Sequence, residues 1–318
     1  MFGTVAEPSR VAVRSRPMDD CIIIGAGPAG LTAAIYLARF HLSIRLFDCG
    51  SSRAATIPCT RNHAGYPDGI PGKDLLAAML DQAEHHGAVC EGRKVTAIKR
   101  EGEDFAVVAD DTRYPARSVL LATGVVNNRP KMDAAVHDEA LARGLIRYCP
   151  ICDGYEVTDR RVGVIGTGDH GMREALFLRG YTPDITLIAP GAAHDLDPAC
   201  TAKLDAGGIA HVDGPCAGIR IDGDRIVVDT ADGPLAFDSI YPALGSKIRS
   251  ELAVAAGAAA TEEGCLEVDA HQRTTIPGLF AAGDVVKGLD QISHAMGEAG
   301  VAATAIRNML DERRPLRR

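Results

Sequence analysis

The sequence predicts an α/β protein of two nucleotide-binding domains, with the second domain inserted into the first. Three observations lead to this fold class. A glycine-rich turn between an apolar strand and a helix occurs twice, near residues 25 and 166. A strand, turn and helix at residues 278–310 have no sheet of their own. The 318 residues are also enough for two domains of roughly 100–200 residues each.

Residues 21–48 form the first glycine-turn unit, a short apolar strand, a turn, a helix and a second strand that ends on Asp48. Gly25 permits the tight turn, Gly27 lets the backbone approach a pyrophosphate, and Gly30 lets the helix pack closely on the strand. Asp48 lies 23 residues after Gly25, where a carboxylate accepts hydrogen bonds from an adenosine ribose. Strand, turn, helix and acid together predict a dinucleotide site.

Residues 162–189 repeat this pattern with glycines at Gly166, Gly168 and Gly171, but Ala189 stands where the first copy has its acid. Each copy is followed by short strand-like segments and then by a similar apolar strand, at 118–124 and 239–245. Two complete units of this kind indicate an internal duplication with two nucleotide sites.

The final segment, with its Gly283–Asp284 turn, needs a partner sheet, and the first unit is the one that it can complete. The second unit is then an insertion. We therefore expect three parts: a disordered extension at 1–17, a discontinuous first domain at 18–127 and 246–318, and an inserted domain at 128–245.

Composition excludes several classes of protein. The net charge of −8 argues against nucleic acid as the main partner, and no apolar run approaches the ~18 residues of a membrane span. Residues 1–17 contain three arginines but no continuous apolar stretch, so they are not a secretory signal, and Met18 is an alternative start. The nine cysteines are an odd number with one close pair, which favours a reducing cytoplasm over a secreted disulfide scaffold.

That close pair, Cys149 and Cys152 in YCPICDGYE, has three interpretations at this point. It is half of a zinc site, a structural crosslink or a redox-active dithiol. A structural zinc needs two further ligands, and the other cysteines are scattered singly with no histidine pair at ligand spacing.

The motifs GAGPAG, ATG at 122–124, CPICD, GTGDHG and GLFAAGDV, in that order, resemble the low-molecular-weight thioredoxin reductases over residues 19–310. The CxxCD motif inside the inserted domain is the most specific of them. The resemblance implies two Rossmann-like domains with three ββα layers, a discontinuous FAD domain, an inserted NADPH domain that rotates, and a homodimer. It also favours the redox interpretation of the cysteine pair, because a flavin in the same chain supplies electrons, and we expect no metal.

The resemblance also implies roles for individual residues. Cys152 is the sulfur nearer the flavin, Cys149 attacks the external disulfide, and Asp153 is a general acid. The residues implied to contact FAD are Gly25, Gly27, Pro28, Ala29, Gly30, Asp48, Asn62, Ala122, Thr123, Gly124, Gly283, Asp284, Gln291 and Ile292, and those implied for the second nucleotide are Gly166, Gly168 and Gly171.

The chain departs from the family's pattern in two places. Residues 189–193 read APGAA, without the arginines that bind the 2′-phosphate of NADPH, so NADPH is the expected cofactor but its selector is missing. Three alternatives follow. NADPH binds through other residues, such as Arg173 or Arg179; NADPH and NADH both bind, each weakly; or another donor, such as ferredoxin, supplies the electrons. At the flavin helix, the family's Arg-Gln-Ala is Asp290-Gln291-Ile292.

The leading function is therefore FAD-dependent reduction of the disulfide of thioredoxin or a thioredoxin-like protein. Two alternatives remain: a dithiol oxidase that closes disulfides in a small molecule and reduces O₂, and a non-catalytic redox sensor that binds a flavin or nucleotide.

Overall fold

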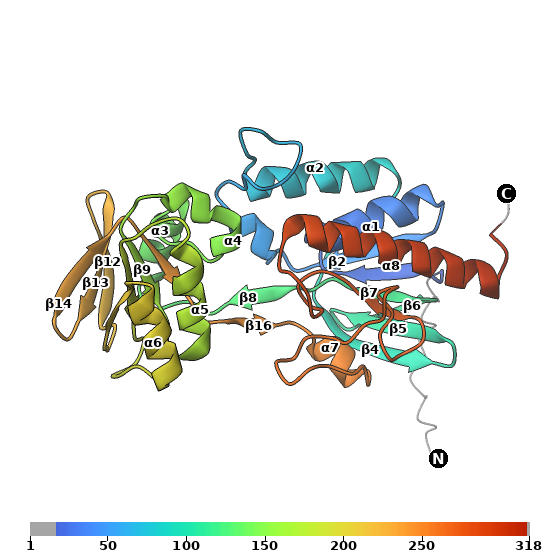
Figure 1. The fold of residues 1–318 in the computed structure, drawn as a ribbon. Coiled ribbons are helices and arrows are strands. Elements are labelled where there is room, and N and C mark those ends of the chain that lie inside the picture. Colours follow the sequence, from blue (N-terminus) through green and yellow to red (C-terminus); the bar gives the residue numbers. More distant parts are fainter. Residues whose placement is uncertain (1–16, 317–318) are drawn as a thin grey trace, which may run out of the picture.

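The computed structural model describes residues 17–316, so the disordered extension expected at 1–17 lies, apart from Pro17, outside the described residues. A parallel sheet of five strands has the order β17-β7-β1-β2-β3 (Figure 1). Its strands are β1 (Cys21–Ile24), β2 (Ile44–Asp48), β3 (Val89–Gly92), β7 (Val119–Leu121) and β17 (Leu279–Ala281). Because β17 pairs in parallel with β7, the C-terminal segment adds to the sheet that the N-terminal segment begins.

The strands β1, β7 and β17 are buried on both faces of this sheet, which is why they read as continuous apolar runs. Successive side chains of β1 point to opposite faces. Ile23 packs on the helices α1 (Pro28–Arg39), α2 (Gly72–His85) and α8 (Ile292–Arg313). Ile22 packs on the other side, against a small antiparallel sheet and α7 (Glu251–Ala255). The strands of that small sheet are β4 (Val95–Glu101), β5 (Asp104–Ala109) and β6 (Thr112–Ala116).

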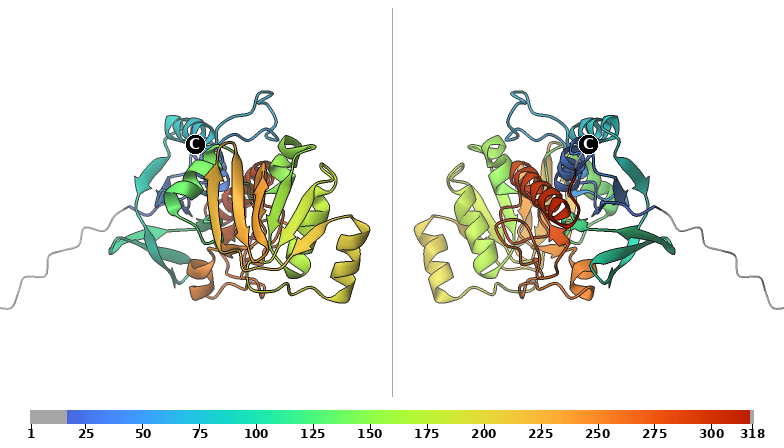
Figure 2. Two further views of the ribbon diagram at one scale, coloured as in Figure 1. Left: turned by 90° about the vertical axis from the view of Figure 1, so that its left-hand side faces the viewer. Right: turned by 90° about the vertical axis from the view of Figure 1, so that its right-hand side faces the viewer.

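Small residues allow the long helix α8 to lie close against α1. Ala299, Ala302 and Ala303 belong to the same buried cluster as the apolar side of α1. The right-hand view of Figure 2 shows α8 in red beside α1 in blue.

The second domain repeats the three layers. Its parallel sheet has the order β11-β10-β9-β15, with strands β9 (Val162–Ile165), β10 (Ile185–Ile188), β11 (Ala210–Val212) and β15 (Ser239–Pro242). One face is covered by α5 (Gly168–Leu178) and α6 (Pro198–Ala206). The other face packs on α3 (Ala134–Ala142) and an antiparallel sheet of β12 (Gly218–Asp222), β13 (Arg225–Thr230) and β14 (Gly233–Phe237). The predicted fold class, with two Rossmann-like ββα units, is confirmed.

Two strands connect the domains. β8 (Val125–Asn127) leaves the first domain and β16 (Ser246–Ile248) returns to it, and the two pair in an antiparallel ladder that Figure 1 shows between the two bodies. The remaining short helices are η1 (Arg53–Thr56), α4 (Pro150–Asp153) and η2 (Gly154–Val157). The short helix α4 carries the cysteine pair.

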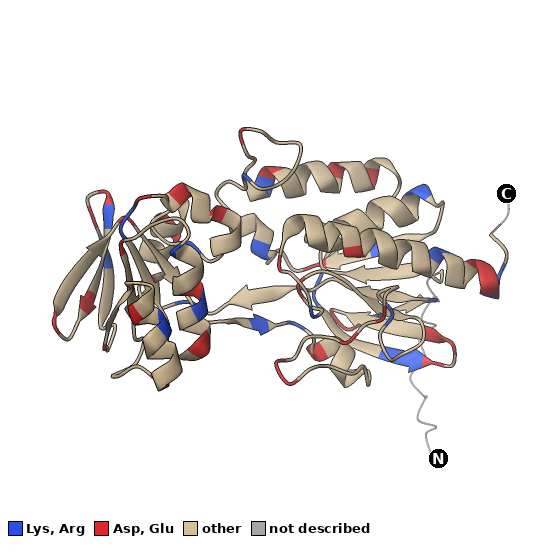
Figure 3. Cartoon of the chain, viewed as in Figure 1, with Lys and Arg blue, Asp and Glu red and all other residues tan. Residues whose placement is uncertain are grey.

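Acidic and basic residues are interspersed along both domains in the coloured cartoon of Figure 3. No helix among the described residues is both long enough and apolar enough to cross a bilayer.

Close backbone contact explains the glycines of the first turn. Gly25 has φ +107°, and a Cβ on it would lie 2.3 Å from the carbonyl oxygen of Ala122. A Cβ on Gly30 would lie 1.8 Å from the carbonyl oxygen of Gly25. The second copy is built alike, since a Cβ on Gly171 would lie 2.8 Å from the carbonyl carbon of Gly166.

We therefore expect Gly30→Ala in α1 to destabilise the protein by about 2 kcal/mol or more, because backbone atoms must move to admit the methyl group. Gly297→Ala is the matched control. It also lies within a helix, α8, but nothing lies within 4 Å of its added Cβ. Higher helix propensity should make this control neutral or stabilising by up to about 1 kcal/mol. Urea denaturation measures both, and equal effects would contradict the packing argument.

Candidate active site

A cavity of about 1060 Å³ is lined by residues of both domains. It opens at the C-terminal ends of β1, β2, β7 and β17, because parallel strands bring the residues that follow them to one edge of the sheet. The predicted residues that line it are Gly25, Gly27, Pro28, Ala29, Asp48, Asn62, Ala122, Thr123, Gly124, Cys149, Cys152, Asp153, Gly283, Asp284, Gln291 and Ile292. Gly30 packs beneath the turn instead, and Gly166, Gly168 and Gly171 lie in the second domain away from this lining.

The first glycine turn faces the cavity. An added Cβ on Gly27 would meet only the Ser52 hydroxyl, at 3.4 Å, so the backbone is accessible there. The Asp48 carboxylate accepts hydrogen bonds from the amides of Ala26, at 3.1 Å, and Gly50, at 2.8 Å. This acid is therefore anchored at the end of β2 beside the turn.

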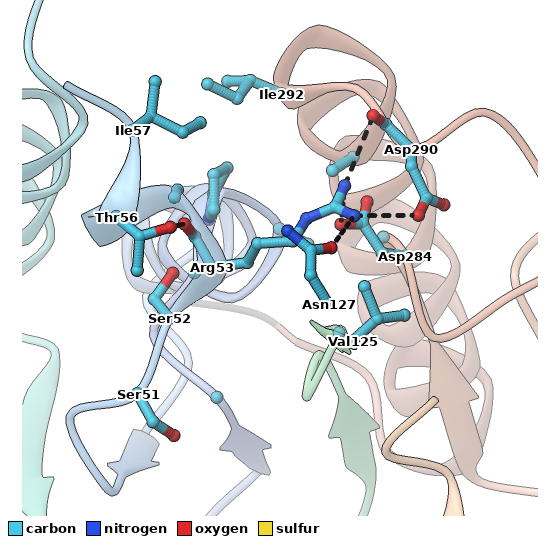
Figure 4. Close-up of a pocket in the computed structure, with 18 of the residues that line it drawn as sticks. Ser51, Ser52, Arg53, Thr56, Ile57, Val125, Asn127, Asp284, Asp290 and Ile292 are labelled. Atoms are coloured by element: carbon cyan, nitrogen blue, oxygen red, sulfur yellow. Dashed lines mark hydrogen bonds and ion pairs between the residues drawn. The ribbon is translucent and has the colours of Figure 1, made fainter. Parts of the chain in front are cut away.

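Arg53 lies at the centre of a charged cluster that the sequence analysis did not identify (Figure 4). Its guanidinium is 2.8 Å from the Asp284 carboxylate, 3.2 Å from that of Asp290 and 3.4 Å from the Asn127 side-chain oxygen. Burial raises the pKa of Asp284 to about 6, although Arg53 opposes that rise. No motif marks Arg53, because its partners come from segments distant in sequence. The unexpected acid Asp290 is thus one of two carboxylates that share this cation.

Cys149 and Cys152 form a disulfide. The Gln291 side-chain amide donates to both sulfurs, at 3.3 Å to Cys149 and 3.2 Å to Cys152. Asn62 in turn donates from Nδ2 to Gln291 Oε1 at 2.9 Å. The two predicted polar residues are therefore joined to the cysteine pair by direct contacts between the two domains. Within residues 17–316, no group of three or more His, Cys, Asp or Glu side chains is arranged to hold a metal ion.

Asp153 follows the cysteine pair and is held by two residues that the sequence analysis missed. Arg147 lies 3.0 Å from Oδ2, and the Tyr241 hydroxyl donates to Oδ1 at 2.9 Å. Burial raises the pKa of Asp153 above its ordinary value, while Arg147 and the Tyr241 hydroxyl oppose the rise. Tyr241 comes from β15, so only the folded sheet brings it to the cysteine pair.

The second glycine turn has different surroundings from the first. The loop after β10 folds over it, so that the Asp195 amide donates to the Thr167 hydroxyl at 2.7 Å. His194 Nδ1 is 3.3 Å from the same hydroxyl, and burial lowers the pKa of His194. An added Cβ on Gly168 would lie 3.4 Å from the Asp195 carbonyl oxygen.

The two arginines considered as substitutes for the missing cluster are engaged elsewhere. Arg173 forms an ion pair with Asp169, an acid in the first turn of α5. Arg179 lies at the opposite end of α5 and donates to the Gly207 carbonyl oxygen at 2.8 Å. An ion pair thus occupies the first turn of α5, at a helix N-terminus of the kind that attracts phosphate.

Comparison with known proteins identifies similar sequences and structures. Residues 19–299 match the family described as pyridine nucleotide-disulphide oxidoreductase. A thioredoxin reductase of Listeria innocua is 32% identical over 316 residues, which cover 92% of this chain and 94% of the relative.

Two solved structures differ in how well they superpose. Thioredoxin reductase from Streptococcus pyogenes has a TM-score of 0.83 at 26% identity and covers 93% of this chain and 99% of its own. Lactococcus lactis thioredoxin reductase, described as in the FR conformation, has a TM-score of 0.60 at 28% identity, with 92% and 99% covered. Identity and coverage are similar, so the lower score reflects a different arrangement of matching segments.

The raised pKa of Asp284 predicts a pH dependence of stability. Between about pH 4 and about 6 the folded protein binds a proton at Asp284 that the unfolded chain has lost, so stability falls as the pH rises through this window. We expect the free energy of unfolding of the wild type, relative to that of Asp284→Asn, to fall by about 3 kcal/mol between these two pH values. Urea denaturation at several pH values, on protein without bound flavin, measures this difference. The exposed Asp81→Asn in α2 is the control for loss of one carboxylate, and a pH-independent difference for Asp284→Asn would contradict the prediction.

Proposed function

The chain belongs to the pyridine nucleotide-disulphide oxidoreductase family and, within it, to the thioredoxin reductases, and we propose that its substrate is the disulfide of thioredoxin or a thioredoxin-like protein. The observation that carries this proposal is the position of the Cys149–Cys152 disulfide. It lines the same cavity as the dinucleotide turn of the first domain, next to the half-buried acid Asp153.

The family implies FAD and a nicotinamide cofactor. The first turn fits FAD, because its glycines leave backbone amides exposed to a cavity of about 1060 Å³ and Asp48 stands at the ribose position. In this proposal Gly25, Gly27 and Asp48 bind the adenosine and pyrophosphate, and Asp284, Gln291 and Ile292 lie nearest the flavin end. When bound, FAD supplies the electron pair that reduces the disulfide.

The reduced cysteines then carry out thiol–disulfide exchange. The Cys149 thiolate attacks one sulfur of the external disulfide, so a mixed disulfide forms and the second external sulfur leaves. Asp153 donates a proton to that leaving thiolate, since burial favours its protonated form. The Cys152 thiolate then attacks Cys149, which releases the external sulfur that Cys149 had bound and restores the Cys149–Cys152 disulfide.

A partner protein must reach sulfurs that face the first domain in this structure. We propose that the second domain rotates about the connection formed by β8 and β16, since this connection is a two-stranded ladder of only three residue pairs. The lower TM-score against the Lactococcus structure at equal coverage supports such a second arrangement. We also propose a homodimer, by resemblance, and a cytoplasmic location, which seven free cysteines among the described residues favour.

For the electron donor, we propose a nicotinamide nucleotide, NADPH among them, that is selected only weakly through its 2′-phosphate. Residues 189–193 lack a basic side chain, and Arg173 and Arg179 are paired elsewhere. A second candidate function follows from the loop that covers the second glycine turn. A dithiol oxidase needs no nucleotide, because it converts a dithiol and O₂ into a disulfide and hydrogen peroxide.

We expect Cys149→Ser and Cys152→Ser each to lower the rate of thioredoxin reduction at least about a thousandfold, because neither sulfur alone completes the exchange. Both variants should retain flavin, seen as absorbance near 450 nm. Cys265→Ser, at a free cysteine outside the cavity lining, is the matched control and should keep full activity. Undiminished activity in both active-site variants would exclude the proposed role of the pair.

For the donor, we expect kcat/KM for NADPH to exceed that for NADH by less than about tenfold, since residues 189–193 carry no arginine and Arg173 and Arg179 already have partners. Anaerobic stopped-flow mixing with NADPH, NADH and reduced ferredoxin, followed at 450 nm, measures this ratio. A preference for NADPH of a hundredfold or more would contradict weak selection. Hydrogen peroxide release from dithiols without any nucleotide would favour the oxidase instead.

A further inference from the structure

We propose that Gln291 is a catalytic residue that stabilises the thiolate of the reduced Cys149–Cys152 pair, and that Asn62 and Thr60 are positioning residues that orient its amide. This inference rests on the redox role proposed for the pair. It assigns Gln291 and Asn62 a function toward the sulfurs, in addition to the flavin contact that the resemblance implies.

The hydrogen bonds run in one direction from Thr60 to the sulfurs. The Thr60 hydroxyl donates to Asn62 Oδ1 at 3.1 Å, which turns the Asn62 amide so that Nδ2 faces Gln291. Asn62 Nδ2 donates to Gln291 Oε1 at 2.9 Å, which leaves Gln291 Nε2 pointing at the sulfurs. If the Gln291 amide were reversed, its Nε2 would face the Asn62 Nδ2, which is also a donor, and its Oε1 would face the sulfurs without a hydrogen to donate.

The Gln291 side chain is available for this contact. Gln291 is the N-cap residue of α8, a position at which side chains commonly accept hydrogen bonds from the first turn. Here it makes no such capping bond. Its amide instead extends from the first domain to the sulfurs of the second, at 3.3 Å and 3.2 Å.

The contact gains strength in the reduced state. Two electrons and one proton convert the disulfide into one thiol and one thiolate, and the electrons come from the donor of the thioredoxin reductase reaction. A disulfide sulfur is a weak acceptor, whereas a thiolate forms a charge-assisted hydrogen bond of roughly twice the strength of a neutral one. Gln291 therefore favours the reduced, ionised pair over the disulfide.

The carboxylates near the cysteine pair already have arginine partners, so the Gln291 amide can donate to the sulfurs without competing for an unpaired acid. Each carboxylate that faces this region has an arginine partner: Asp153 with Arg147 at 3.0 Å, Glu156 with Arg61 at 4.0 Å, and Asp284 and Asp290 with Arg53 at 2.8 Å and 3.2 Å. The Tyr148 hydroxyl, which also borders the cavity, lies 2.8 Å from His137 Nε2. On the Cys149 side, the Cys152 backbone amide adds a donor at 3.1 Å.

Thiolate formation is measured directly by the pH dependence of alkylation. Cys149 and Cys152 share one tryptic peptide, residues 148–160, which contains no other cysteine, so mass spectrometry separates them from the other seven. The purified protein is reduced anaerobically, pulsed with iodoacetamide from pH 5 to 9, and digested. We expect Gln291→Leu to move the midpoint of alkylation of the more reactive sulfur upward by about one pH unit, about a tenfold loss of thiolate below the midpoint. Gln291→Glu, which replaces the donor by a negative charge, should move it further.

The double variant tests the orienting role. Asn62→Leu and Thr60→Val should each give a smaller upward shift, and neither should add to the shift of Gln291→Leu when combined with it, because both act through Gln291. Gln82→Glu, on the exposed side of α2, is the matched control and should leave the midpoint unchanged.

Unchanged midpoints in both Gln291 variants would overturn the proposal. A shift for Asn62→Leu that persists at full size beside Gln291→Leu would overturn the orienting role. If Gln291→Leu does not fold, Gln291→Glu supplies the same test with a side chain of nearly the same shape. The titration requires no thioredoxin, so a wild-type protein that fails to reduce thioredoxin would refute the proposed function and leave this result standing.

Discussion

Close packing of three backbone segments at one edge of the first sheet is the constraint on which the site depends. Gly25 approaches the carbonyl of Ala122, and Gly30 approaches the carbonyl of Gly25, at distances that admit no Cβ. The turn, the end of β7 and the start of α1 therefore meet without intervening side chains. The space above them becomes the cavity, which Asp48 at the end of β2 and Asp284 after β17 line from either side of β1 and β7.

The two domains show how one architecture yields two different sites. Both have a glycine turn between a central strand and a helix, and both turns are closely packed. In the first domain the turn faces a large cavity, whereas in the second the loop after β10 contacts Thr167 and lies over Gly168. The layers of the fold are thus duplicated, while the ligand chemistry depends on the loops that follow them.

Charge within the cavity is balanced locally. Arg53 lies between Asp284 and Asp290, and Arg147 pairs with Asp153, so each of these three carboxylates has a nearby cation. Burial still dominates at Asp153 and Asp284, since the pKa of each remains raised. A cavity of this kind can retain a proton near the cysteine pair while placing neutral donors, such as the Gln291 amide, against the sulfurs.

The sequence by itself determined the fold class, because glycine spacing and apolar periodicity are local properties that each strand–turn–helix unit carries. It also indicated the residues that follow the strands, such as Asp48 and Asp284, since parallel strands end at a common edge. Only the tertiary structure brought Arg53 to Asp284, Tyr241 to Asp153 and Gln291 to the cysteines. These pairs join segments far apart in the chain, and no local pattern specifies which distant side chain will lie within hydrogen-bonding distance.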